Sequence, residues 1–287
     1  MQLADLAKNP SILAKGHRTC RGCGIPLVVR QILRVFDRPV IIVNATGCLE
    51  VTTCFGGDTS WKTPYLHTAF GCAPAAATGV AAVLKHRARN AKVVVFAGDG
   101  ATFDIGLAAL SGMMSRGDDV LYVCYNNEAY MNTGVQCSGA TPPGALTQTT
   151  PAGNQWPAKD IMQIVAAHSP QYAAQASISH WMDLSKKAQK AFSIKGPAFL
   201  HVLSPCPLGW RSESSLTVRL AQLAVETGYW PLLSYERGKW SHDLPIANRA
   251  PVKEFLKIQG RFSERDYATI QGRVDEKWNQ LGKLCEN

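Results

Sequence analysis

The chain has 287 residues, of which 46% are hydrophobic and 18% are charged, and its formal net charge is +9. This composition is ordinary for a soluble globular protein with a sizeable core. The longest apolar runs, 40–43 and 93–97, are too short to span a bilayer, and no secretory signal precedes them. We expect a cytoplasmic protein with no membrane span. The basic residues are scattered and form no recognisable nucleic-acid-binding motif, so we expect no nucleic-acid partner.

Short β-branched runs alternate with longer Ala- and Leu-rich stretches along the chain. In chain order, the pattern predicts a helix at 25–36, a strand at 40–44, a helix at 73–89, a strand at 92–98, a helix at 105–116, a strand at 120–126, helices at 161–168 and 181–192, and a strand at 198–203. Near-continuous apolar strands are typical of a parallel sheet that is buried on both faces. We therefore predict an α/β fold with a doubly wound, mainly parallel sheet flanked by helices.

Two regions interrupt this alternation. Residues 132–155 are rich in Gly, Pro, Thr and Ser and are too long for a simple connection, which indicates a functional loop. After Cys206 the chain becomes more polar, with two predicted helices at 213–227 and 264–281. We predict an α/β domain at 1–207 and a C-terminal extension at 208–287 that packs on a partner subunit.

The nine cysteines favour metal ligation over disulfides, because the count is odd and no signal peptide is present. Cys20 and Cys23 are about one turn apart, and Cys48 and Cys206 each follow a predicted strand, where ligands collect in such sheets. Four thiolates can hold Zn²⁺ or a [4Fe–4S] cluster, and the dispersed third and fourth positions favour the cluster. The remaining cysteines are predicted to be small buried hydrophobic residues: Cys54, Cys72, Cys124, Cys137 and Cys285.

A second group of polar residues follows two other predicted strands. Gly98-Asp99-Gly100 ends one strand, and Asn126-Asn127 ends the next. Glycines allow a diphosphate to approach the backbone, and the oxygens of Asp99 and Asn127 suit Mg²⁺. A plain strand–turn–helix would explain Gly-Asp-Gly alone, but it does not explain the asparagine pair.

These motifs resemble the β subunit of pyruvate:ferredoxin oxidoreductase, within the 2-oxoacid:acceptor oxidoreductase family. Gly-Asp-Gly followed by Asn-Asn is the thiamine-diphosphate fingerprint. The other matching segments, which extend over nearly the whole chain, are GHRTCRGCG (16–24), ATGCLE (45–50), YNNEAYMNTG (125–134), SGATP (138–142), PCPLGWR (205–211) and LAVETG (223–228).

The resemblance implies a thiamine-diphosphate-binding fold and a specific set of site residues. The implied [4Fe–4S] ligands are Cys20, Cys23, Cys48 and Cys206. The implied Mg²⁺ ligands are Asp99, Asn127 and the carbonyl of Ala129. Gly98, Gly100, Thr133 and Gly134 would bind the cofactor, and Asn132 would lie near the thiazolium and the substrate. Glu50 is a further catalytic candidate, with an ordinary surface glutamate as the alternative.

The resemblance also implies an activity, namely CoA-dependent oxidative decarboxylation of a 2-oxoacid with one-electron transfer to the cluster. Pyruvate is the first candidate substrate; oxalate, phenylglyoxylate and branched-chain 2-oxoacids are alternatives within the family. The implied partners are an α subunit that supplies the pyrimidine-side Glu, γ and δ (ferredoxin-like) subunits, and ferredoxin or a similar acceptor. Outside the family, the alternatives are a non-redox thiamine enzyme and a zinc-stabilised scaffold.

One position departs from the family pattern, and two histidines need a separate interpretation. Many family members carry an acidic residue directly after C-x-G-C-G, whereas this chain has Ile25. The activating carboxylate would then come from the α subunit. His17 and His67 are interpreted as hydrogen-bonded structural groups rather than as catalysts.

Overall fold

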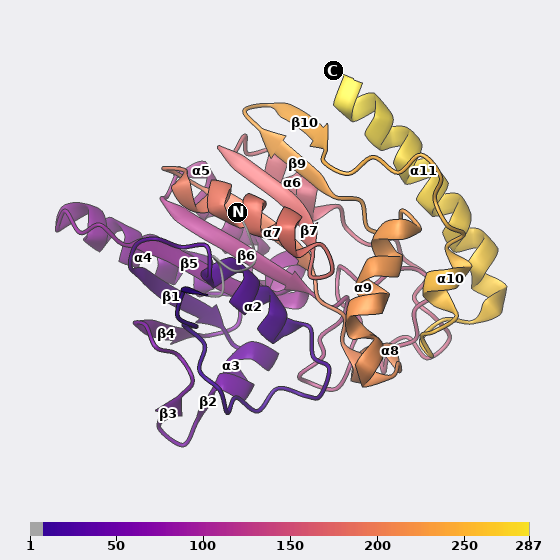
Figure 1. Ribbon diagram of the computed structural model, residues 1–287, viewed down its shortest axis with the longest axis horizontal. Helices are drawn as coiled ribbons and strands as arrows, with labels where there is room; N and C mark the ends of the chain where they lie inside the picture. The colour runs from indigo at the N-terminus through magenta and orange to yellow at the C-terminus, as the bar shows by residue number, and fades with distance from the viewer. Residues whose placement is uncertain (1–7, 287) are drawn as a thin grey trace.

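A computed structural model describes residues 8–286, and within this range eight strands form one sheet (Figure 1). Their order is β10-β9-β7-β8-β6-β5-β1-β4. The six strands from β7 to β4 are parallel, and β9 and β10 run antiparallel at one edge. The strands span Val40–Ala45 (β1), Tyr65–Thr68 (β4), Lys92–Gly98 (β5), Val120–Asn126 (β6), Tyr172–Ser177 (β7), Ala198–Leu203 (β8), Leu233–Glu236 (β9) and Lys239–His242 (β10).

Helices cover both faces of the sheet. Helices α2 (Ile25–Leu33) and α7 (Trp181–Ser193) pack on one face, and α4 (Ala73–His86), α5 (Leu107–Ser115) and α6 (Ile161–Ala166) pack on the other. Alternate residues of each central strand enter different cores: in β5, Val94 and Phe96 face α2 and α7, whereas Val93 and Val95 face α4 and α5. The predicted doubly wound α/β architecture is confirmed.

The C-terminal extension forms a third core beside this sandwich. Its helices are α8 (Pro207–Trp210), α9 (Thr217–Glu226), α10 (Lys253–Leu256) and α11 (Tyr267–Glu286). Trp210, Leu220, Phe255 and Ile270 are buried among them. Helix α11 lies beside β10 at the right of Figure 1, and the β9–β10 hairpin joins the main sheet. Packing of this extension on a partner subunit stays a prediction.

Several short elements were not predicted from the sequence. A π-helix at Gly100–Ile105 precedes α5, so the helix predicted at 105–116 begins two residues late. The alanine-rich strand β7 and the short strand β4 lack a long β-branched run, which is why the pattern missed them. The remaining small elements are α3 (Cys48–Thr53), β2 (Cys54–Phe55), β3 (Asp58–Thr59) and two 3₁₀ turns at Ser214–Leu216 and Glu264–Asp266.

The predicted burial of the five cysteines that are not proposed ligands can be checked directly. Cys124 is buried as predicted, but the prediction is wrong for Cys72, which is exposed at the start of α4. Cys54, Cys137 and Cys285 are half-buried. Between residues 8 and 286, no helix is both long and apolar enough to cross a membrane.

Candidate functional site

The carboxyl ends of the central parallel strands meet at one edge of the sheet and enclose a cleft. It is formed by the segments that follow β1, β5 and β6, which is where ligands bind in open α/β sheets. Eight residues singled out from the sequence line it: Cys48, Gly98, Asp99, Gly100, Asn127, Ala129, Asn132 and Thr133. The other lining residues were not predicted individually: Thr46, Gly47, Phe70, Ala101, Tyr125, Tyr130 and Met131.

Three oxygen atoms converge inside this cleft. The side-chain oxygen of Asn127 faces only acceptors, with Asp99 Oδ1 at 3.0 Å and the Ala129 carbonyl oxygen also at 3.0 Å. A rotated Asn127 amide would donate to both. A cation between the three oxygens is an alternative to this rotation, since adjacent ligands of octahedral Mg²⁺ at about 2.1 Å lie about 3.0 Å apart. The donor set therefore fits Mg²⁺.

Asp99 is the charged member of this group, and its side chain is 1% exposed. Burial raises the pKa of Asp99 to about 7, against hydrogen bonds that favour its charged form. One of these bonds is donated by Ser138 Oγ to Oδ2 at 2.5 Å. A buried carboxylate with so little compensation is a favourable place for a cation.

A tyrosine ring explains one of the glycines beside Asp99. A Cβ atom on Gly100 would lie 2.3 Å from Cε1 of Tyr130, so only glycine fits there. The Tyr130 hydroxyl donates to Asp104 Oδ2 at 3.0 Å, and its ring stacks on Phe70. Gly100 is thus required because a side chain there would collide with Tyr130, which also lines the cleft.

The four predicted cluster thiols share one region of the molecule. The pKa of Cys23 is raised to about 12, mainly by burial and also by the nearby thiols of Cys206 and Cys20. Burial raises the pKa of Cys48 to about 12 as well, and the other three thiols and Asp99 add to the shift. Burial also raises the pKa of Cys206. These mutual effects place the thiols and Asp99 in one region of the molecule, within reach of one another's charges.

Two glycines bring the N-terminal cysteine loop to this region. A Cβ on Gly22 would lie 2.2 Å from the carbonyl oxygen of Ser214, and a Cβ on Gly24 would lie 2.9 Å from Ser204 Oγ. The Gly24 amide also donates to the Pro205 carbonyl at 3.2 Å. The C-x-G-C-G loop therefore rests directly on the turn that carries Cys206.

The thiols are not arranged for a single ion. Within the described range 8–286, no three His, Cys, Asp or Glu side chains are close enough to share one metal ion. Among the described residues, the thiols therefore form no compact single-ion site of the structural zinc type.

Glu128 lies between two of the three converging oxygens and has an unusual backbone. Its φ is +66°, a left-handed conformation that costs a non-glycine residue about 1 kcal/mol or more. Its side chain is 4% exposed and pairs with Arg261 at 2.6 Å. Tyr229 Oη donates to the same carboxylate at 3.0 Å. None of these three residues belongs to the set of site residues predicted from the sequence.

The remaining predicted residues lie outside the cleft lining. Glu50 is 3.8 Å from His67, whose Nε2 is 2.7 Å from the hydroxyl of Thr46 in the cleft wall. Gly134 has a φ of +116° and approaches Gln136. Ile25 is 2% exposed and belongs to the core under α2, and His17 is hydrogen-bonded to Thr19 and Arg30.

The cleft and the fold define a class of protein. Residues 45–202, more than half of the chain, match the family model of the thiamine pyrophosphate enzyme, C-terminal TPP binding domain. The chain is therefore a thiamine pyrophosphate enzyme domain of the C-terminal, TPP-binding type.

Full-length relatives narrow this class. The chain is 46% identical to pyruvate synthase subunit PorB of Methanocaldococcus jannaschii, covering 94% of this chain and 96% of the relative. It is 44% identical to PorB of Thermotoga maritima, with 96% and 92% covered. It is 41% identical to ketoisovalerate oxidoreductase subunit VorB of Pyrococcus abyssi, with 94% and 92% covered. The chain belongs to this PorB/VorB family of 2-oxoacid oxidoreductase subunits.

A solved structure gives independent support for the fold. A chain of the 2-oxoglutarate:ferredoxin oxidoreductase from Magnetococcus marinus superposes with a TM-score of 0.63 at 21% identity. The match covers 92% of this chain and 96% of that one, so the C-terminal extension is part of the shared fold.

Proposed function

We propose that this chain is the thiamine-diphosphate-binding β subunit of a pyruvate:ferredoxin oxidoreductase, which decarboxylates pyruvate oxidatively and transfers the acyl group to CoA. The convergence of a three-oxygen cation site and four thiols at one edge of the sheet carries the proposal. Identity of 46% to a PorB subunit, against 41% to a VorB subunit, supports pyruvate over a branched-chain substrate.

The oxygens of Asp99, Asn127 and Ala129 would hold Mg²⁺ and, through it, the diphosphate. Bound thiamine diphosphate supplies a carbon nucleophile for the 2-oxo group and an electron sink for decarboxylation. Asn132 lines the cleft, where it would hydrogen-bond the substrate. Phe70 and Tyr130 stack on each other in the same lining and would limit the access of water.

Cys20, Cys23, Cys48 and Cys206 would hold a [4Fe–4S] cluster, whose chemistry is one-electron transfer. Cys48 belongs to both sites, because it lines the cleft and its pKa responds to Asp99 and to the other thiols. All nine cysteines are free thiols, which suits metal ligation in the reducing cytoplasm, where we propose that the protein acts.

The proposed enzyme needs other subunits. The cleft holds the diphosphate side of a thiamine site, and the α subunit would supply the pyrimidine-side Glu. The γ and δ subunits and ferredoxin would carry the electrons onward. The names of the relatives, which are subunits of pyruvate synthase and ketoisovalerate oxidoreductase, support such an assembly.

The deciding experiment is an anaerobic assay of the co-purified complex with pyruvate, ketoisovalerate and 2-oxoglutarate, each with and without CoA. We expect CoA-dependent reduction of ferredoxin with pyruvate, and iron and acid-labile sulfide in the complex. Faster turnover of ketoisovalerate would assign the branched-chain activity instead. A complex that is free of iron, or one that releases CO₂ without reducing an acceptor, would contradict the redox function. The isolated chain should bind iron but show no turnover.

A further inference from the structure

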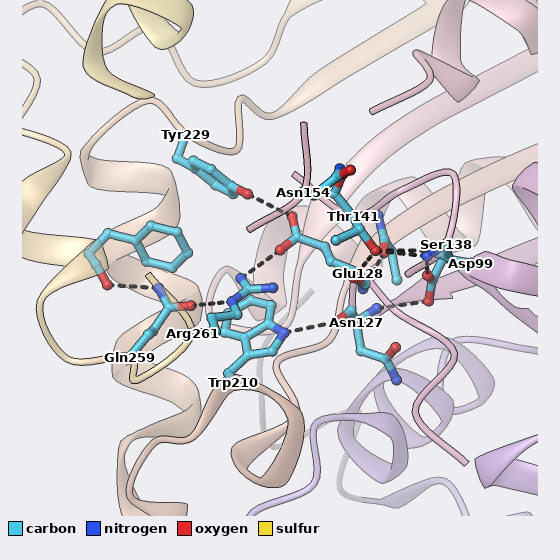
Figure 2. Close-up of polar contacts among 12 residues, drawn as sticks. Asp99, Asn127, Glu128, Ser138, Thr141, Asn154, Trp210, Tyr229, Gln259 and Arg261 are labelled. Atoms are coloured by element: carbon cyan, nitrogen blue, oxygen red, sulfur yellow. Dashed lines mark hydrogen bonds and ion pairs between the residues drawn. The ribbon is translucent and has the colours of Figure 1, made fainter. Parts of the chain in front are cut away.

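The peptide segment that carries the cation-binding oxygens is held from its far side by the C-terminal extension. Glu128 separates Asn127 from Ala129, and in Figure 2 its carboxylate points away from Asp99 toward Tyr229 and Arg261. Arg261 is 133 residues away in sequence and is 3% exposed. The contact is therefore a buried tertiary link between the extension and the cation site.

Arg261 is itself fixed in one orientation. Its Nε donates to Gln259 Oε1 at 2.8 Å, and its Nη2 donates to Glu128 Oε2 at 2.6 Å. The guanidinium stacks over the ring of Trp210, 3.8 Å from the centroid. A planar guanidinium that donates hydrogen bonds from its edge and stacks on an aromatic ring with its face has little freedom to move.

The same group of residues also holds the main chain. Trp210 Nε1 donates to the carbonyl of Asn127 at 2.8 Å. Thr141 Oγ1 donates to the carbonyl of Glu128 at 2.8 Å, and the Glu128 amide donates to Asn126 Oδ1 at 2.8 Å. The left-handed turn at Glu128 is thus fixed through its side chain and through both of its peptide groups. This turn sets the direction of the Asn127 side chain and of the Ala129 carbonyl.

A purely stabilising role explains this arrangement less well. A buried ion pair contributes little stability over an apolar pair of the same size. Mg²⁺, in contrast, demands near-ideal octahedral geometry, so its affinity depends on where the ligand oxygens are held.

We propose that Arg261 is a positioning residue for the cation site, acting through Glu128, so that the C-terminal extension completes the Mg²⁺-diphosphate site. This inference rests on the proposed function, because it takes the three oxygens to be Mg²⁺ ligands.

The test measures the dissociation constant of Mg²⁺ for the assembled complex at a fixed saturating concentration of thiamine diphosphate. Arg261→Lys keeps the positive charge but loses the planar guanidinium with its fixed N–H donors. We expect a dissociation constant about 10- to 100-fold higher than in the wild type. If that variant fails to assemble, Tyr229→Phe removes one hydrogen bond to Glu128 at constant shape and should raise the constant about fivefold.

The matched control is Arg249→Lys. Arg249 belongs to the same extension, but its partners, Asp275 at 2.9 Å and the ring of Trp278, both belong to helix α11 and not to the Glu128 turn. We expect it to leave the dissociation constant within about twofold of the wild type. An equal rise of the dissociation constant in both variants would show that Arg261 only stabilises the extension in general, and it would overturn the inference.

A double-mutant cycle tests the role of the left-handed turn. Glycine adopts positive φ without strain, so Glu128→Gly removes the need for a clamp. Adding Arg261→Lys to Glu128→Gly should then change the dissociation constant less than about threefold. Wild-type affinity in Arg261→Lys alone would overturn the inference while leaving the proposed function intact. Failure of the wild-type complex to bind Mg²⁺ with thiamine diphosphate would overturn both.

Discussion

Ser138 donates a 2.5 Å hydrogen bond to Oδ2 of Asp99, while Oδ1 of the same carboxylate faces Asn127. Oδ2 therefore accepts a short bond from Ser138, whereas Oδ1 accepts a longer one, at 3.4 Å, from the backbone amide of Asn127. Ser138 comes from the long Gly- and Pro-rich segment that was predicted to be a functional loop. The loop thus contributes a direct contact to the candidate cation site.

Ser138→Ala should weaken Mg²⁺ binding by about 10-fold or more, because Asp99 loses the bond that fixes its rotamer. Titration of Mg²⁺ into the complex with thiamine diphosphate measures the effect. Ser234→Ala is the control, since it removes a 2.8 Å bond from Ser234, on the edge hairpin strand β9, to Asp243, which follows β10. Unchanged Mg²⁺ affinity in Ser138→Ala would contradict the assignment of Asp99.

Gly100→Ala should destabilise the protein by about 1–3 kcal/mol and lower cofactor affinity, because the new methyl group collides with the Tyr130 ring. Urea unfolding and thiamine diphosphate titration measure the two effects. Gly79→Ala is the control: no atom lies within 4 Å of the added carbon, and alanine favours the helix α4. It should be neutral or stabilising by up to about 1 kcal/mol.

Cys20→Ala should abolish or strongly reduce the iron and acid-labile sulfide content of the anaerobically purified complex, because the proposed cluster loses one ligand. Cys72→Ala is a matched control, since both thiols are exposed and neither substitution disturbs a core. Equal iron content in the two variants would rule out Cys20 as a ligand.

The folded protein should lose stability as the pH falls below about 6.5, in part through His201. Burial lowers the pKa of His201 to about 3, so the folded state binds its proton less readily than the unfolded state does. The stability from this neutral ring is complete above pH 6.5 and decreases as the pH falls toward 3. Between pH 7 and pH 5 the loss is about 2 kcal/mol.

His201→Gln should flatten that part of the pH profile, measured by urea unfolding at several pH values. Glutamine can still accept from Asn126 Nδ2 and meet the side chain of Gln175, the two partners of the ring. A profile as steep as the wild type would show that other groups account for the acid sensitivity.

The parallel strands and the cleft residues that follow them could be predicted because the information is local. The apolar runs of β5 and β6 are continuous, and Asp99 and Asn127 stand directly after them. Strand ends of a parallel sheet meet at one edge, so their convergence follows from the topology.

The contacts that shape the cleft could not be predicted in this way. Arg261 and Glu128 are brought together only by the folded C-terminal extension, and no local pattern connects them. Gly22 is required because the Ser214 backbone occupies the space that a side chain would need, and this contact is absent from the local sequence. Strand β7 escaped prediction because three of its six residues are alanine and only the sheet around it defines it as a strand.

The four-residue helix α8 has a consequence for the whole subunit. Cys206 caps its start, Trp210 ends it, and the Trp210 amide donates to the Cys206 carbonyl at 2.8 Å. A sulfur of the proposed iron site and the indole that anchors Asn127 are thus mounted on one turn of backbone. The distance between the iron–sulfur cluster and the thiamine cofactor would then be fixed by rigid main chain. A substitution that moved one binding site would also disturb the other.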